Sequence, residues 1–505
     1  MNLEEKVQAY KDWIFKKSAY TMALAIIDID KETVAPAGGN AYRDARSAFL
    51  AGELFSIETD PKILPILKDL KENPNIDEDT KRAASLYYDS IQKTVCIPKN
   101  EFVALEELKN TSYTKWLEAK RSNDYSIFEP YLKKLIAEKK KIYGYRNRTQ
   151  SIYDQMLDDF EPGMNTQKYD VFFAQLKAAL VPLIQKISSA SQIDDSYLFD
   201  VFPIEEQKKY MEHMLEYLHF DASWGYQNET EHPFTSWTCE NDCRTTTKYL
   251  QDNIMSALFS TIHEVGHAYY EHDVDPKYDG MILSEGISSG MHESQSRLCE
   301  NYLGRSKAFW EYNYPSLQKQ FPKQLKDVSL DAFMRAINVS KPSLVRTEAD
   351  ELTYPMHILI RYEIEKGLFD GTISVEGLDQ TWADLYEKYL GVHPKNASEG
   401  ILQDVHWSMG EFGYFPTYAL GSAYAAQFVE KMREEIDVDD LLRNNHYDVV
   451  MHWLKEHIHQ YGCRYDAEEI MKKATGKPFD VNIYITYLIN KYGKLYGVEM
   501  HEGTC

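Results

Sequence analysis

The sequence predicts a mainly α-helical protein with one small β-sheet. Apolar residues recur at helical spacing, as from Phe128 to Ile136 and every four residues from Phe172 to Ile184. Alternating segments are scarce, and the best one is CRTTTKY at 243–249, where β-branched and aromatic residues favour a strand. Proline and glycine separate the helical segments at NPNIDED, EPGMN, DVDPKYDG and FDGT.

We expect one continuous domain over residues 1–505. The sequence contains no Gly/Ser-rich or Pro-rich linker, no low-complexity tract and no repeat that would mark a boundary. Hydrophobic residues make up 43% of the chain and include 21 Phe, 37 Tyr and 8 Trp, which is enough for a large core.

Charge and cysteine content narrow the class of function and the compartment. The net charge is -23, and the lysines are scattered, which disfavours nucleic acid or an anionic membrane as a partner. Six cysteines without a CxxC pair indicate reduced thiols. The N-terminus has no apolar signal region, and no stretch of about 18 uncharged apolar residues occurs. We therefore expect a cytoplasmic protein without a transmembrane helix.

The stretch STIHEVGHAYYEH at 260–272 carries the strongest candidate site. On a helix, His263 and His267 lie one turn apart and can direct imidazole nitrogens at one ion. Apolar residues such as Leu258 and Val265 form a separate stripe that can pack against a core. Zinc held by neutral imidazoles lowers the pKa of its bound water towards ~7, and a nearby carboxylate can then take the proton. Glu264 is the candidate general base.

A catalytic zinc needs a third protein ligand, and Glu293 is the best candidate. It lies in SEGISSGMHESQSRLCEN, a second helical stretch that follows a Pro/Gly-marked turn and could pack beside the first. Arg297 and Glu300 share its face and could orient it, whereas His292 points to another side and is a poorer ligand. The alternatives are two ordinary histidines on a solvated helix and a surface ion pair between Glu293 and Arg297.

Several stretches resemble the carboxypeptidase Taq family of metallocarboxypeptidases. HEVGH followed by HESQSRLCEN matches the pattern of that family. Five further stretches match it in order: HPF at 232–234, DCRTT at 242–246, VRTEAD at 345–350, GILQDVHW at 400–407 and FGYFPTYALGSAYAAQ, which begins at Phe412. One departure is Cys299, where the family commonly has tryptophan, and it leaves the local packing open.

The resemblance implies a large helical zinc-peptidase fold with a deep cleft and a small β-sheet beside the HExxH helix. Residues 1–230 would form a helical part that covers the cleft, and residues 231–427 would carry the catalytic motifs. The implied activity is that of a zinc-dependent, cobalt-substitutable exopeptidase, usually a homodimer, which removes single residues from peptide C-termini. The two histidines and Glu293 would hold one metal ion per chain, with Glu264 as the general base.

Recognition of a terminal carboxylate favours a planar guanidinium, and Arg346 in VRTEAD is the leading candidate. The alternative is an ion pair between Arg346 and Asp350 on a solvated helix. Arg244 in DCRTT could shape the edge of the cleft, because a strand beside the substrate can offer backbone hydrogen bonds to an extended peptide. Through the resemblance, His232 of HPF is a further candidate substrate contact.

A tetrahedral intermediate needs a hydrogen-bond donor at its oxyanion. Tyr414 and Tyr418 stand around a Gly/Pro-marked turn before a helix, where a phenol could swing towards the metal. The alternative is that both tyrosines pack in the core. His406 and Asp404 could support the site from a second shell or contact the substrate.

Two other functions stay open. An oligoendopeptidase would share the zinc site but cut within short peptides, and a non-catalytic peptide-binding protein could retain a structural zinc. Glu264 disfavours the second, because a purely structural site needs no base. The sequence therefore predicts a metallocarboxypeptidase.

Overall fold

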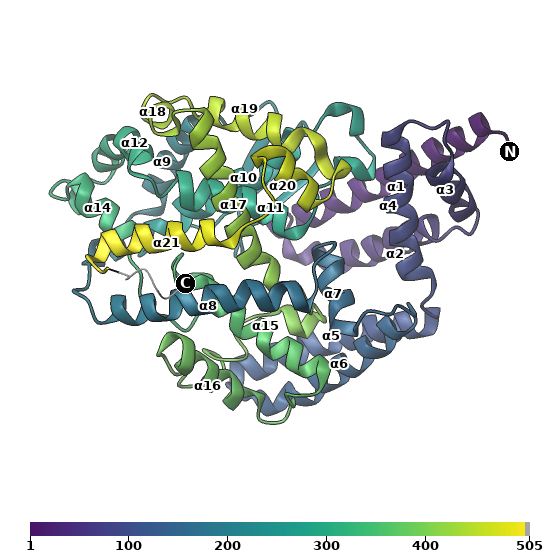
Figure 1. Ribbon diagram of the computed structural model, residues 1–505, viewed down its shortest axis with the longest axis horizontal. Coiled ribbons are helices and arrows are strands. Elements are labelled where there is room, and N and C mark those ends of the chain that lie inside the picture. The colour runs from purple at the N-terminus through teal and green to yellow at the C-terminus, as the bar shows by residue number, and fades with distance from the viewer. Residues whose placement is uncertain (500–505) are drawn as a thin grey trace.

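Helices account for most of the protein in the computed structural model, which describes residues 1–499 (Figure 1). These residues contain 21 α-helices and one three-stranded sheet, so the mainly α prediction is confirmed. The helices before the sheet are α1 (Leu3–Thr33), α2 (Asn40–Glu58), α3 (Ile63–Glu72), α4 (Glu78–Val95), α5 (Lys99–Ser122), α6 (Glu129–Gly144), α7 (Ile152–Phe160), α8 (Thr166–Ser188) and α9 (Ile204–Tyr217).

The part of the chain after the sheet carries all but two of the predicted site residues. Its helices are α10 (Ile254–His272), α11 (Ser289–Arg297), α12 (Lys307–Gln320), α13 (Pro322–Leu325), α14 (Leu330–Ile337), α15 (Tyr354–Asp370), α16 (Leu378–Leu390), α17 (Phe415–Glu435), α18 (Val438–Arg443), α19 (Tyr447–His457), α20 (Ala467–Thr475) and α21 (Val481–Tyr496). A π-helical segment, η6 (Leu298–Leu303), continues α11.

The sheet consists of β1 (Gly225–Glu229), β2 (Thr235–Cys239) and β3 (Asp242–Thr247), in the order β1-β3-β2. The central strand β3 runs parallel to β1 and antiparallel to β2, with Thr235 opposite Thr245. It corresponds to the strand predicted at 243–249, and its three consecutive threonines are buried beneath α10. The outer edge of β2 pairs with no strand among the described residues, so β2 is an edge strand.

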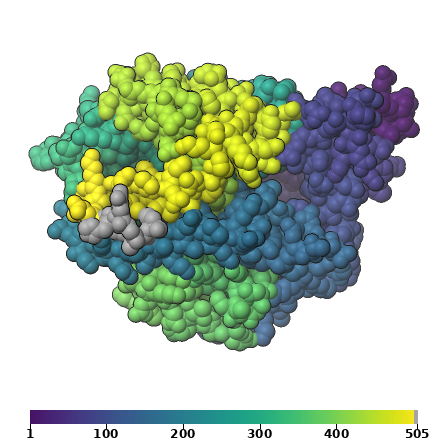
Figure 2. Space-filling model, viewed as in Figure 1, coloured from purple at the N-terminus to yellow at the C-terminus, as the bar shows by residue number. Residues whose placement is uncertain are grey.

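The buried side chains form two hydrophobic clusters. The larger cluster joins the helices from α5 onward and packs around α10, α15 and α17. The smaller cluster joins α1, α3 and α4 to residues 274–283, which follow α10. In Figure 2 the N-terminal helices, in purple and dark blue, project from one side of the body. Their organisation with the remaining chain as a single domain stays a prediction.

Helix α8 is the one helix of the described residues that is long and apolar enough to span a membrane. Its apolar side chains, among them Phe172, Leu176 and Leu180, are buried, and the helix packs against α21 and α15. Figure 1 shows α8 and α21 lying side by side. These contacts are those of a core helix, which is apolar because it packs inside the protein.

Candidate metal centre and cleft

Helix α10 carries the HEVGH motif. It begins after Asn253, whose side chain accepts a hydrogen bond from the backbone N–H of Met255. Its buried stripe includes Leu258, Ile262 and Val265, which fix the helix in the core. The two histidines are only partly buried and lie off this stripe, as the spacing predicts.

Helix α11 carries Glu293 and lies unusually close to its neighbours. Its N-terminus is capped by Ser288, whose hydroxyl accepts a hydrogen bond from the N–H of Met291. A β-carbon at Gly266 of α10 would come within 2.8 Å of the α11 backbone. A β-carbon at Gly421 of α17 would come within 2.8 Å of the Glu293 side chain. The two glycines thus allow α10 and α17 to approach α11 from two sides.

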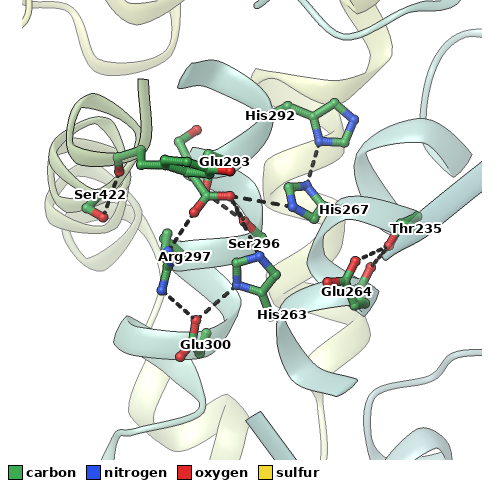
Figure 3. A network of polar contacts seen from close by, with 12 residues as sticks. Thr235, His263, Glu264, His267, His292, Glu293, Ser296, Arg297, Glu300 and Ser422 are labelled. Carbon is green, nitrogen blue, oxygen red and sulfur yellow. Dashed lines mark hydrogen bonds and ion pairs between the residues drawn. The ribbon is translucent and has the colours of Figure 1, made fainter. Parts of the chain in front are cut away.

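His263, His267 and Glu293 form a group that fits a metal ion. One ligand atom of each lies within 4.8 Å of the other two. Each histidine Nε2 is 3.6 Å from Oε2 of Glu293, and Figure 3 shows both imidazoles directed at this carboxylate. Two imidazoles and one carboxylate are a ligand set of catalytic zinc sites.

Neighbouring charges hold two of these groups in place. Nδ1 of His263 donates to Oε2 of Glu300 over 3.0 Å, which leaves Nε2 free for a metal. Nε of Arg297 donates to Oε1 of Glu293 over 2.7 Å and Nη1 donates to Glu300 over 3.1 Å. The prediction that Arg297 and Glu300 orient Glu293 is consistent with these contacts. The ion pair between Glu293 and Arg297, which was the alternative to a metal ligand, also exists. Glu293 is only 6% exposed, so this is a buried pair that holds the carboxylate in place and not a surface pair.

The pKa values of Glu293 and His267 favour the forms that bind a metal, whereas burial lowers the pKa of His263 but the carboxylates of Glu293 and Glu300 outweigh it and raise that pKa. Burial raises the pKa of Glu293, but Arg297 and the two histidines outweigh it and hold that pKa well below its usual range. Burial lowers the pKa of His267 to about 3. An ionised carboxylate and a neutral imidazole are the forms that bind a metal.

His292 lies outside the ligand group, as predicted, but it contacts a ligand. Its Nδ1 is 2.6 Å from Nδ1 of His267, and its Nε2 is 2.6 Å from Oε1 of Glu271. Sequence reasoning missed Glu271, although it follows His267 by four residues and therefore shares its face of α10.

Glu264 is buried at the cleft and held by a hydroxyl group. Thr235 of β2 donates to Oε2 of Glu264 over 2.6 Å, and Figure 3 shows this contact beside the histidines. Burial raises the pKa of Glu264, while the charge of His263 and the hydrogen bond from Thr235 oppose the rise. Thr235 also was missed, because its contact depends on how the sheet packs against α10.

A cleft of about 1090 Å³ opens at the metal centre. Its walls are formed by α1, the edge strand β2, the segment 274–289 after α10, and the first turn of α17. The histidines, Glu264 and Glu293 line it, and the aromatic side chains Tyr414 and Tyr418 lie at the same cleft.

Tyr414 precedes α17 and Tyr418 lies in its first turn, with ring centroids 5.0 Å apart. The hydroxyl of Tyr418 is 3.5 Å from Nε2 of His406. Burial raises the pKa of Tyr414 to about 12 and that of Tyr418 further, so both phenols keep their protons. The two tyrosines therefore offer hydrogen-bond donors to the cleft.

Arg346 does not lie on a helix beside Asp350 but in a short 3-10 turn. Its Nε and Nη2 donate to Oδ1 of Asp404 over 3.0 and 2.9 Å, and Nη1 donates to Tyr354. Asp404 also accepts two hydrogen bonds from the fully buried Arg361. The guanidinium of Arg346 lies 5.1 Å from the ring centroid of Tyr418, which lines the cleft, whereas Arg346 does not line it.

The remaining predicted residues lie at the periphery. Arg244 is on the central strand β3 and donates two hydrogen bonds to Asp242. Residues of β2 line the cleft, whereas no residue of β3 does. His232 is exposed, whereas the next residue, Pro233, lines the cleft. Cys299 is buried in η6 beside Gly266 and leaves Glu293 in place.

Comparison with known proteins identifies the family. The model of the carboxypeptidase Taq (M32) metallopeptidases matches residues 10–492. The chain is 42% identical over 499 residues to carboxypeptidase 1 of Bacillus subtilis, with 98% of this chain and 100% of that protein covered. It is 35% identical to thermostable carboxypeptidase 1 of Thermus thermophilus, with 95% and 97% covered.

A solved structure agrees with this assignment. The crystal structure of the M32 carboxypeptidase from Deinococcus radiodurans superposes with a TM-score of 0.95 at 31% identity, covering 98% of this chain and 100% of that one. With the His263, His267 and Glu293 group in its cleft, the chain belongs to the carboxypeptidase Taq family of metallopeptidases and is a metallocarboxypeptidase.

Proposed function

We propose that this chain holds one zinc ion through His263, His267 and Glu293 and hydrolyses the last peptide bond of peptides with a free C-terminus. The observation that carries the proposal is the convergence of three ligand atoms within 4.8 Å in a cleft. Three protein ligands leave a position for water or substrate, as a catalytic zinc requires. Cobalt suits the same ligands and is an alternative metal.

Glu264 is the general base of this proposal. When bound, the metal activates the attacking water and polarises the scissile carbonyl. Glu264 takes the proton from that water on its carboxylate and delivers it to the leaving amine nitrogen. Its burial supports this role, because the raised pKa increases its affinity for the proton. The hydroxyl of Thr235 keeps the carboxylate at the cleft.

Tyr418 and Tyr414 supply the oxyanion donor. Both line the cleft, and both keep their phenolic protons at neutral pH. A phenol directed at the developing oxyanion would stabilise the tetrahedral intermediate more than the substrate. His406, 3.5 Å from the hydroxyl of Tyr418, is placed to orient it.

Arg346 recognises the terminal carboxylate. Arg346 and Arg361 share the single carboxylate of Asp404, which leaves an excess of one positive charge in a buried cluster. Such an excess is costly unless an anion compensates it. The substrate carboxylate supplies this anion once Tyr418 moves aside.

The edge of β2 binds the substrate backbone. Its residues line the cleft, and an extended peptide can add to a free strand edge. The paired side chains of Arg244 and Asp242 lie next to the turn of the β2–β3 hairpin, and His232 lies where the chain enters β2. We assign both a role in shaping this edge.

We also propose a cytoplasmic location and a homodimer, which rest on evidence from outside the active site. Cys96, Cys239, Cys243, Cys299 and Cys463 are free thiols, which suits a reducing cytoplasm. The homodimer is supported by the family resemblance, and light scattering of the purified protein would test it.

Metal analysis combined with peptide cleavage tests the activity. We expect about one zinc per chain and release of single C-terminal amino acids from an unblocked peptide. The matched control is the same peptide with a C-terminal amide, whose cleavage should fall because the positive cluster loses its anion. Undiminished cleavage of the amide, with internal fragments, would indicate an oligoendopeptidase instead.

A further inference from the structure

Glu271 and His292 form a hydrogen-bonded chain that ends on the ligand His267. Oε1 of Glu271 lies 2.6 Å from Nε2 of His292, and Nδ1 of His292 lies 2.6 Å from Nδ1 of His267. Figure 3 shows His292 in contact with one nitrogen of His267 and Glu293 in contact with the other. The chain therefore reaches the ligand from behind its metal-facing nitrogen.

The direction of the hydrogen bonds follows from metal binding. Nε2 of His267 faces Glu293 and must be unprotonated to bind a metal, so Nδ1 carries the proton and donates. Nδ1 of His292 is then the acceptor, and Nε2 of His292 carries the proton. A carboxylate that accepts from this N–H completes the chain. We propose that Glu271 and His292 are positioning residues that fix the tautomer and ring orientation of His267.

The surroundings of Glu271 suit this single task. Its side chain is 1% exposed, and Oε2 is buried without a hydrogen-bond partner. The contact with His292 is its one polar side-chain contact among the described residues. A carboxylate is costly to bury without a partner, and the imidazole of His292 is the partner that compensates this cost for Glu271.

Packing keeps the intermediate imidazole in place. The ring of His292 lies 5.1 Å from that of Tyr270 and 5.9 Å from that of Trp237. Tyr270 belongs to α10 and Trp237 to the cleft strand β2, so both rings are fixed by regular structure. His263 needs no such intermediate, because Glu300 accepts directly from its Nδ1. Each imidazole ligand thus has its own carboxylate behind it.

Zinc affinity, measured by competition with a chelator, tests the proposal without relying on turnover. We expect Glu271→Leu to weaken zinc binding about 10- to 100-fold, as for other residues behind metal ligands. Glu271→Gln should recover most of this loss, because its amide oxygen can accept from Nε2 of His292. Thr247→Val is the matched control, since it removes a buried hydrogen bond to α10 away from the metal centre. Its zinc affinity should be unchanged.

A second measurement applies to the unaltered protein and does not depend on a variant folding. With zinc bound and histidine ring nitrogens labelled, NMR should find the proton of His292 on Nε2 and that of His267 on Nδ1. Zinc affinity within twofold of the original in folded Glu271→Leu, or a proton on Nδ1 of His292, would overturn the proposal. The inference rests on the proposed metal ligands, but its failure can be told apart from failure of the proposed activity. A protein that binds zinc and shows this tautomer pair but cleaves no peptide would refute only the activity.

Discussion

The protein buries two clusters of charged side chains whose excess charges have opposite signs. At the metal centre, the carboxylates of Glu264, Glu293 and Glu300 outnumber the guanidinium groups that contact them, Arg297 and Arg305. In the second cluster, two guanidinium groups share the one carboxylate of Asp404. The side chains of Arg361 and Asp404 are 0% and 10% exposed, so bulk water compensates little of this charge.

The difference supports the ligand that we propose for each cluster. An excess of buried negative charge is compensated by a cation, and an excess of buried positive charge by an anion. A metallocarboxypeptidase needs both, because it holds a divalent metal and recognises a terminal carboxylate. Tyr418 lies between the clusters, since it lines the cleft and its ring lies beneath Arg346. Each prediction below changes one cluster and leaves the other intact.

The largest expected effect is that of Glu264→Gln on turnover. The glutamine side chain is not ionisable, so it cannot take the proton from water, and the rate constant kcat should fall about 10²- to 10⁴-fold. Its amide oxygen can still accept from Thr235, so metal content should stay at the original value. Steady-state kinetics with metal analysis measures both. Near-normal kcat would remove the general-base role from Glu264.

Glu293→Ala should weaken metal retention. The change removes a ligand and leaves Arg297 without its partner, so the loss should exceed the ~10- to 100-fold typical of residues behind the ligands. Metal content after dialysis measures it. An unchanged stoichiometry would assign the third ligand to another residue.

Arg346→Met should act on substrates with a free C-terminus. Charge-assisted hydrogen bonds are worth ~1.5–3 kcal/mol, so kcat/KM for the free peptide should fall about 10- to 100-fold. The slow cleavage of the amidated peptide should change little. Arg433→Met on α17 is the control, because its ion pair with Asp439 lies on the surface. Equal losses for both peptides would show that Arg346 has only a structural role.

The smallest effect is a pH dependence of stability. Burial raises the pKa of Asp404, but Arg361 and Arg346 outweigh it and hold the pKa well below its usual range. Because the folded pKa is lower than the unfolded value of ~3.9, the ion pairs stabilise the protein above that pH and lose their contribution as the pH falls through the folded pKa.

Urea unfolding of the original protein and Asp404→Asn should show this loss. The difference in unfolding free energy should narrow on acidification, by ~1.4 kcal/mol for each unit by which the pKa is shifted. A difference that stays constant from about pH 6 to the lowest pH at which both proteins fold would contradict the assigned ion pairs.

The metal centre was predictable because its spacing is local. One turn of helix places His263 beside His267, and ligand chemistry made Glu293 on the next α-helix the best candidate for the third ligand. Spacing alone left a surface ion pair of Glu293 with Arg297 open, and the family resemblance favoured the ligand. Of the sheet, the central strand was recognisable from its threonines, whereas β1 (GYQNE) has few strand-forming residues and the short β2 (TSWTC) was not predicted.

The second cluster was not predictable in the same way. Asp350, four residues after Arg346, suggested a helical ion pair, but Arg346 lies in a 3-10 turn and Asp350 accepts hydrogen bonds from Leu352 and Thr353 before α15. The true partner, Asp404, comes from a distant segment. Thr235 and Arg361 were missed for the same reason, since tertiary packing and not sequence spacing sets their contacts.

The glycines at 266 and 421 have a consequence for metal exchange. Because neighbouring backbones press on α11 from two sides, this helix has no room to slide or roll when the ion changes size. Substituting a larger or smaller ion must then be accommodated by torsions of three side chains, while the scaffold stays rigid. We therefore expect the rotamers of His263, His267 and Glu293 to decide which ion this centre prefers.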